Sequence, residues 1–202
     1  CITHGHGGSL LQHLKELAIH TNVKSEDKML FLTTCGWMMW NWTVSNLLLG
    51  SSIVLYDGSP FYPNINRVIN ITKDTNSTML GAGAKVYETI QNNYKSNKKD
   101  ILKKINCFIS TGSPLSPDTF KFINKILNSK SFIHSVSGGT DIVSCFMLGI
   151  PTLPVYSGEI QGPGLGMDID VFNDNGKPTK KTGELVCKTP FPSKPIFFWN
   201  DR

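Results

Sequence analysis

Residues 135–141, Ser-Val-Ser-Gly-Gly-Thr-Asp, form a stretch of small side chains that ends in a hydroxyl and a carboxylate. Glycines in such a stretch let backbone N–H groups approach an anion without interference from a Cβ atom. Thr140 can donate a hydrogen bond to a phosphate oxygen, and Asp141 offers the hard oxygen ligand that Mg²⁺ prefers. These residues predict a loop that holds a nucleotide phosphate and its metal ion. The alternative is a plain turn, in which Gly138 and Gly139 only reverse the chain between two strands.

A second stretch of small residues, Ser110–Pro114, follows the apolar run Cys107–Ile109. Both stretches come directly after segments that we predict to be buried strands, the other being Phe132–Val136. In an open α/β sheet, ligands bind at the edge where the parallel strands have their carboxyl ends. We therefore expect both stretches at that edge.

The elements that must position these loops alternate along the chain up to residue 136. Strands are predicted at residues 29–33, 53–56, 78–80, 107–109 and 132–136. Helices are predicted at residues 9–20, 37–49, 64–73, 86–94 and from residue 116 onward. The alternation predicts an α/β fold with a mostly parallel, doubly wound sheet and flanking helices.

Two helix starts have specific signals. The first predicted helix is amphipathic, because Leu10 and Leu14 recur on one face and Glu16 lies on the other. Ser9 is expected to cap its N-terminus. The last predicted helix begins at Ser116-Pro117, and proline is favoured in the first turn of a helix.

The sequence changes in character near residue 150. Prolines and glycines punctuate short alternating runs from there on, and Asn173-Asp174-Asn175-Gly176 is a strong hairpin turn. We predict two parts: an α/β part over residues 1–150 that is incomplete at its N-terminus, and a partial β-rich subdomain, part of a distorted barrel, over 151–202. The chain starts at Cys1, without an initiator methionine, so we expect a segment of a longer protein.

Composition argues against several classes of protein. The net charge of +5 comes almost entirely from lysine, since arginine occurs only at Arg67 and Arg202. Arginine is the preferred residue for reading nucleic acid, and the lysine-rich segment near residue 100 lacks aromatic residues that could stack on bases. Sequence runs approaching the 18 or so apolar residues of a membrane span are absent as well. We therefore expect neither a nucleic acid nor a membrane as partner.

Cysteine and histidine spacing does not indicate a metal centre. The five cysteines lie dozens of residues apart and form no Cys-x-x-Cys pair, so reduced thiols and a cytoplasmic location are the simplest expectation. His4 and His6 lie two residues apart, but the sequence offers no third ligand beside them. We interpret both histidines as ordinary loop residues.

Five motifs, in order along the chain, resemble those of the adenylate-forming acyl-CoA synthetase superfamily. They are Gly36–Trp40, Ser110–Pro114, Ser137–Asp141, Gly158–Gly162 and Gly183–Val186. Together they extend over almost the whole chain. The resemblance is strongest to enzymes of the family that act on acetoacetate.

The resemblance implies a two-step ligase reaction. A carboxylate attacks the α-phosphate of ATP·Mg²⁺ to give an acyl-adenylate and pyrophosphate, and the thiol of coenzyme A then displaces AMP. It implies that Thr140 hydrogen-bonds the α-phosphate and that Asp141 binds magnesium, although most relatives carry a glutamate there. It also implies the remaining nucleotide contacts, which come from Gly112, Ser113, Pro114, Ser137, Gly138 and Gly139.

The resemblance further implies an acyl site. Trp37, Met38 and Met39 match the family's acyl-binding helix start, and methionine is an adaptable pocket lining. Acetyl-CoA synthetases carry a tryptophan where this chain has Gly138, and that ring closes their pocket beyond a two-carbon acid. Glycine is therefore expected to admit a longer acid such as acetoacetate. A second interpretation makes the aromatic and methionine cluster ordinary core filling.

The same comparison leaves the isolated segment incomplete. The family's phosphate loop and its mobile C-terminal domain would lie outside this sequence, so we expect the segment alone to be inactive and to need those parts of the same enzyme. Two alternatives stay open. One is a synthetase for another short- or medium-chain acid, and the other is a non-catalytic, truncated fragment with an interaction role.

Overall fold

The central feature of the computed structural model is a five-stranded parallel sheet with the strand order β3-β2-β4-β5-β6. The structure describes residues 1–95, 98–99 and 101–201. The strands of this sheet are β2 (Lys28–Phe31), β3 (Ser52–Val54), β4 (Met79–Gly83), β5 (Cys107–Thr111) and β6 (Phe132–Ser135). The predicted α/β class and the parallel sheet are confirmed.

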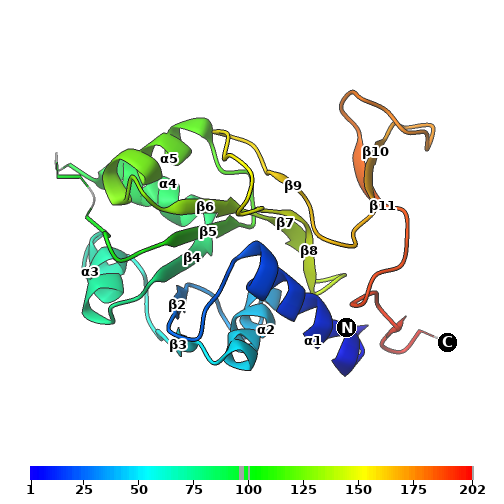
Figure 1. Cartoon of the computed structure of the whole chain (residues 1–202), viewed down its shortest axis with the longest axis horizontal. Coiled ribbons are helices and arrows are strands. Elements are labelled where there is room, and N and C mark those ends of the chain that lie inside the picture. Colours follow the sequence, from blue (N-terminus) through cyan, green and yellow to red (C-terminus); the bar gives the residue numbers. More distant parts are fainter. Residues whose placement is uncertain (96–97, 100, 202) are drawn as a thin grey trace.

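Helices cover both faces of this sheet (Figure 1). Those on one face are α3 (Arg67–Asp74), α4 (Ala84–Asn93) and α5 (Pro117–Phe122), which continues into the π-helical turn η3 (Ile123–Leu127). Those on the other are α1 (His6–Lys15), its π-helical extension η1 (Glu16–His20), α2 (Met38–Val44) and the 3₁₀ turn η2 (Ser45–Leu49). The sheet is therefore doubly wound, as predicted.

Alternate residues of each strand supply two separate cores. Leu30 and Phe108 point into the core under α3, α4 and α5, whereas Met29, Met79 and Ile109 belong to the core under α1 and α2. All five side chains are fully buried or nearly so. Strands that are buried on both faces read as continuous apolar runs, which is why the sequence located them well.

The start of α5 follows the sequence closely. Ser116 is the N-cap, and its Oγ accepts a hydrogen bond from the backbone N–H of Thr119 at 3.2 Å. Pro117 occupies the first turn, where its missing N–H costs nothing. The helix therefore begins where β5 and its loop require it.

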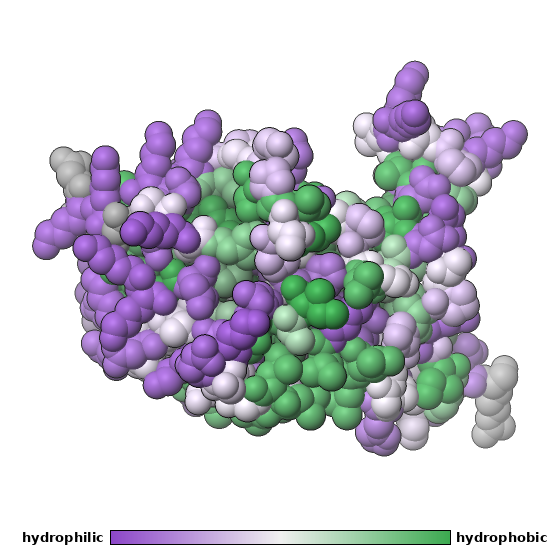
Figure 2. Space-filling view, in the orientation of Figure 1, coloured by the Kyte–Doolittle hydropathy of each residue, from purple (hydrophilic) through white to green (hydrophobic). Residues whose placement is uncertain are grey.

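Helix α1 differs from the prediction in its start and in its orientation. It begins at His6 with Gly5 as N-cap, so the prediction that Ser9 caps it was wrong. The leucines of its apolar face are exposed, Leu10 by 46% and Leu11 by 58%. Figure 2 shows apolar side chains gathered on the surface of this part of the molecule. The polar face points inward instead, through the buried side chains of Gln12, His13, Glu16 and His20.

Beyond β6 the strands become short and antiparallel. A three-stranded sheet follows β6 directly, made of β7 (Ser137–Gly139), β8 (Ser144–Leu148) and β9 (Gly162–Pro163). Strands β10 (Ile169–Phe172) and β11 (Glu184–Cys187) form a separate antiparallel pair that projects from the body (Figure 1), and β1 (Ile2–Thr3) pairs with β12 (Phe197–Phe198).

Two details of this region bear on the sequence predictions. The turn before Gly176 is present, with Gly176 at φ +67° and its N–H bonded to the carbonyl of Asn173 at 2.8 Å. The small-residue stretch after β6 is a strand over Ser137–Gly139 rather than a free loop. The division of the chain at residue 150 stays a prediction.

Membrane-spanning helices of sufficient length and apolarity do not occur in the described part of the chain.

Candidate functional site

Two neighbouring cavities lie where the predicted loops leave β5 and β6. The larger has a volume of about 300 Å³ and the smaller of about 80 Å³. Thr111, Gly112 and Gly138 line both of them. The two stretches of small residues therefore meet at the carboxyl edge of the parallel sheet, as the sequence predicted.

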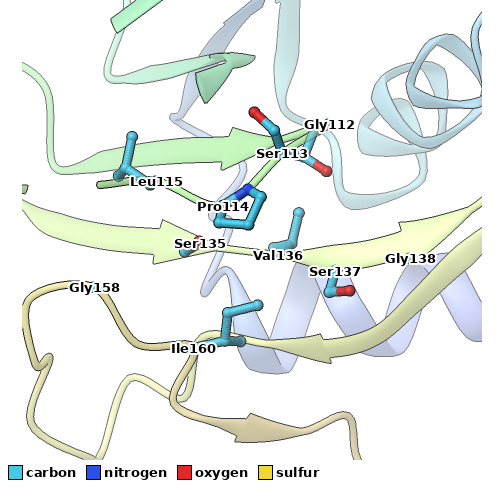
Figure 3. Close-up of a pocket in the computed structure, with 11 residues that line it drawn as sticks. Gly112, Ser113, Pro114, Leu115, Ser135, Val136, Ser137, Gly138, Gly158 and Ile160 are labelled. Carbon is cyan, nitrogen blue, oxygen red and sulfur yellow. The ribbon is translucent and has the colours of Figure 1, made fainter. Parts of the chain in front are cut away.

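The larger cavity is formed by backbone and small side chains (Figure 3). The segment after β5 passes on one side of it, with Gly112 at φ +84°, a conformation that favours glycine. Pro114 and Ile160 add apolar surface to the lining, and the segment of Val136 and Ser137, where β6 leads into β7, passes between them in this view (Figure 3). Such a cavity suits a planar ring held against apolar surfaces with backbone groups at its edge.

The smaller cavity joins the start of α2 to the turn between β7 and β8. Its lining from α2 is Trp37, Met38 and Met39, and its lining from the other side is Gly139, Thr140, Ser144 and Cys145. Trp37 also approaches the first loop, since a Cβ atom on Gly112 would lie 3.8 Å from its Cζ2 atom. The predicted acyl-site residues and the predicted phosphate-site threonine thus share one cavity.

Core filling accounts for only part of the cluster at α2. Met38 and Met39 are buried in the core under α1 and α2, but they also reach the smaller cavity. Trp37 is half-buried and packs its ring edge-on to Phe31 at a centroid distance of 6.2 Å. Trp42 is 1% exposed and does not line this cavity, so it is a core residue.

Thr140 and Asp141 lie in the tight turn between β7 and β8. The turn is closed by the backbone N–H of Val143, which donates to the carbonyl of Thr140 at 3.3 Å. Both side chains are exposed, and Thr140 makes no side-chain hydrogen bond to other described residues. Its hydroxyl is therefore available to a ligand in the smaller cavity.

Asp141 follows Thr140 in the chain but lines neither cavity. Its carboxylate folds back over Gly139, where a Cβ atom would lie 2.4 Å from Oδ1. Clusters of three or more potential metal-ligating side chains do not occur among the described residues. One carboxylate is nevertheless enough for Mg²⁺ when phosphate oxygens and water fill the rest of its shell, so Asp141 fits that ion.

The neighbouring backbone of β8 leaves no room for a side chain at Gly138. This glycine is paired with Cys145 of β8, and a Cβ atom at Gly138 would lie 2.1 Å from the carbonyl oxygen of Ser144. A larger side chain therefore requires β8 to move. The prediction that glycine here opens the acyl site stays untested, and this close approach is a second reason for the residue.

Burial controls the titratable groups behind the smaller cavity. The pKa of the Cys145 thiol is raised well above its usual value, first by burial and then by the nearby charge of Glu16. The pKa of His13 is lowered by burial, although its bond to the carbonyl of Val143 opposes the shift. At neutral pH the Cys145 thiol is therefore protonated and is not a nucleophile. The His13 ring is uncharged, but both of its nitrogens are already hydrogen-bonded, Nδ1 with Ser45 Oγ at 2.8 Å and Nε2 with the carbonyl of Val143 at 2.5 Å.

Sequence reasoning missed several residues of the site. Ser144 lines the smaller cavity without belonging to a recognised motif, and Ile160 lines the larger one from within the Gly158–Gly162 motif, to which the sequence assigned no role. Glu16 was placed on the outer face of a surface helix, yet it is completely buried beside β8. Its partners Trp42, Ser144 and Cys145 come from distant parts of the chain, so no local pattern marked it.

The motifs and their geometry agree with a known enzyme family. A family model described as AMP-binding enzyme matches residues 1–196. The chain belongs to the AMP-binding enzyme family. The larger cavity therefore lies in an AMP-binding fold.

Two synthetases are among the proteins to which this chain is similar. The chain is 46% identical over 203 residues to the acetoacetyl-coenzyme A synthetase of Rhizobium meliloti (strain 1021) and 45% identical over 204 residues to the acetoacetyl-CoA synthetase of Gallus gallus. Each comparison includes 100% of this chain but 31% of the relative. The chain thus spans about a third of the length of these relatives.

A solved structure gives the same result for the fold. The acetoacetyl-CoA synthetase from Streptomyces lividans superposes with a TM-score of 0.87 at 41% sequence identity. The superposition covers 99% of this chain and 32% of that one.

Proposed function

We propose that the protein containing this chain is an acid–thiol ligase that activates acetoacetate with ATP and transfers it to coenzyme A. The observation that carries the proposal is the smaller cavity, which brings Thr140 together with Trp37, Met38 and Met39 and adjoins the larger cavity. An adenylate-forming enzyme needs this adjacency, because the acid must reach the α-phosphate of the bound nucleotide. The names of the relatives support acetoacetate as the acid.

In this proposal the larger cavity holds adenosine. The base lies against Pro114 and Ile160, and the backbone of Gly112 and Ser113 lies along its edge. Adenine presents donors and acceptors at its edge and apolar faces above and below. The lining of this cavity offers the complementary groups, because its small residues expose backbone amides.

Thr140 then contacts the α-phosphate at the junction of the two cavities. Attack by a carboxylate on that phosphorus gains most from alignment and from stabilisation of the charge on the phosphate oxygens. The Thr140 hydroxyl donates to one of these oxygens, and the backbone N–H groups of the β7–β8 turn provide a polar environment. Mg²⁺ held by Asp141 would supply further neutralisation of the phosphate charge.

The acid itself is placed against α2. Met38 and Met39 offer flexible thioether side chains, and the ring of Trp37 closes the side toward Gly112. In the proposed enzyme the thiol of coenzyme A attacks the acyl carbon after pyrophosphate has left. The parts of the relatives that lie outside the matched third would complete the site, so the 202-residue chain alone is expected to be inactive. The five free cysteines support a reducing, cytoplasmic setting.

Exchange of labelled pyrophosphate into ATP tests the proposal in the full-length protein. Acetoacetate, butyrate and acetate are compared at equal concentration, with a reaction lacking acid as control. We expect exchange that depends on acid and is fastest with acetoacetate. Faster exchange with butyrate would assign a different short-chain acid, and absence of exchange with all acids would favour a non-catalytic role.

A further inference from the structure

The buried carboxylate of Glu16 connects the two walls of the smaller cavity. Glu16 lies at the junction of α1 and η1, and its side chain is 0% exposed. Helix α1 packs against η2, the continuation of α2, and against β8, so a side chain on its inner face can reach both sides of the cavity. A π-helical turn at this position is notable because such turns occur often at functional sites.

Four neutral donors converge on this carboxylate from three elements. Nε1 of Trp42 on α2 donates to Oε2 at 2.9 Å. The Ser144 hydroxyl and the Cys145 backbone N–H on β8 both donate to Oε1, the latter at 3.2 Å, and Nε2 of Gln12 donates to the same atom at 3.0 Å. A buried carboxylate is stable only when its oxygens are satisfied, and here donors from both walls satisfy them.

These donors are directly coupled to the residues that face the cavity. Trp42 lies one helical turn after Met38 and Met39, which line it. Cys145 pairs with Gly138, and the strand that contains Gly138 leads directly into Thr140. The α2 side of the cavity, the acyl-binding wall, is therefore held through Oε2, and the β7–β8 side, the phosphate-binding wall, is held through Oε1.

We infer that Glu16 is a positioning residue that sets the separation between the acyl-binding start of α2 and the β7–β8 turn. The inference rests on the proposed function. Glu16 touches no substrate in this arrangement and acts only through Trp42, Ser144 and Cys145. Its charge accepts four bonds with no basic partner among them, so an amide cannot replace it.

Glu16→Gln exchanges one carboxylate oxygen for an NH₂ group and so replaces a hydrogen-bond acceptor with a donor. If the amide oxygen faces Ser144 and Cys145, the amide NH₂ takes the place of Oε2 and opposes the donor N–H of Trp42. This repulsion moves α2 relative to β8 and changes the shape of the acyl wall. A general loss of stability would lower the activity with all acids equally, whereas a displaced wall changes their ratio.

Asp27 offers a matched control. It is 4% exposed and also accepts several hydrogen bonds, from Thr78 Oγ1 at 2.7 Å, Asn106 Nδ2 at 3.1 Å and the backbone of Lys24 at 2.8 Å. It precedes β2, at the amino edge of the sheet, opposite the cavities. Asp27→Asn therefore removes a buried charge of the same kind far from the site.

The experiment measures the ratio of kcat/KM for acetoacetate to that for butyrate in the full-length protein. We expect Glu16→Gln to change this ratio by about fivefold or more and Asp27→Asn to leave it unchanged. Trp42→Phe keeps Glu16 and removes one donor, so it should shift the ratio in the same direction. It should add little in the double variant, because both changes break one link. An unchanged ratio in both Glu16→Gln and Trp42→Phe overturns the inference.

Hydrogen exchange separates this inference from the proposed function. Glu16→Gln should speed exchange at the backbone amides of residues 137–145 by about tenfold, whereas Asp27→Asn should not. If the wild-type protein activates no acid, the proposed function fails and this measurement alone decides the role of Glu16. Equal exchange at 137–145 in wild type and Glu16→Gln contradicts the role.

Discussion

Replacing Thr140 by valine tests the phosphate contact with little disturbance of the fold. Valine matches threonine in shape and lacks the hydroxyl. Thr140 is exposed in the β7–β8 turn, and its side chain has no hydrogen-bond partner within the described chain. Thr140→Val should therefore change the free energy of unfolding by less than about 0.5 kcal/mol.

The expected effect on activity is much larger. A hydrogen bond to a charged oxygen contributes about 1.5–3 kcal/mol, which corresponds to a loss of about 10- to 150-fold in kcat/KM. Pyrophosphate exchange in the full-length protein measures this loss, and the thermal midpoint measures stability in the same sample. Thr140→Ser keeps the hydroxyl and should stay within about threefold of wild type.

Two results would refute this reasoning. Full activity of Thr140→Val would remove the hydroxyl from the reaction. Equal losses in the valine and serine variants, with unchanged thermal midpoints, would mean that the methyl group rather than the hydroxyl matters.

Three further predictions use other parts of the molecule. Asp141→Ala should raise the Mg²⁺ concentration for half-maximal pyrophosphate exchange by about tenfold. Asp141→Glu keeps the carboxylate and should need about the same Mg²⁺ concentration as wild type. A magnesium titration in which Asp141→Glu is as impaired as Asp141→Ala would speak against metal binding. Gly138→Ala should lower the free energy of unfolding, measured by urea titration, by about 1–3 kcal/mol, because its Cβ would meet the Ser144 carbonyl. The control Gly7→Ala in α1 has open space around it and should leave the free energy of unfolding unchanged or raise it. A larger loss in Gly7→Ala than in Gly138→Ala would contradict the packing. Burial lowers the pKa of His134 to about 3, so between pH 6.5 and 3 only the unfolded state binds a proton at this imidazole. The free energy of unfolding should therefore fall by about 2 kcal/mol from pH 7 to 5. A fall of the same size in His134→Phe would show that other groups cause it.

Sequence reasoning located the parallel sheet because its strands are buried on both faces. Their apolar runs, and the capped proline start of α5, are signals that local chemistry fixes. The extent of β4 was less visible, since its last residues are small. Gly81 belongs to the strand through its pairing with Phe31 of β2 and Ile109 of β5. The ring of Phe31 fills the space of a side chain there, since a Cβ atom on Gly81 would approach it to 2.1 Å.

The orientation of α1 was beyond the reach of its own sequence. Periodicity shows that a helix has two unlike faces, and the usual expectation buries the apolar one. Here the polar face is buried because its partners come from distant parts of the chain. His13 bonds the carbonyl of Val143 at 2.5 Å and His20 that of Gly149 at 2.8 Å. No local pattern contains these partners.

The sequence predicted which residues of the candidate site lie together but not the shape of the site, and the roles of these residues stay predictions. The motifs placed Thr140, Gly112 and Trp37 in one site, and the structure brings all three around one small cavity. That Ser137–Gly139 is a strand depends on its pairing with β8, which a single sequence does not show. Glu16 was missed for the same reason.

A crystal structure of the full-length protein with a non-reactive acyl-adenylate analogue tests the central claim most directly. The account predicts the adenine ring in the larger cavity against Pro114 and Ile160, the phosphate mimic within hydrogen-bond distance of the Thr140 hydroxyl, and the acyl group against Met38 and Met39. An analogue bound elsewhere, or one whose phosphate mimic points away from Thr140, would contradict the account.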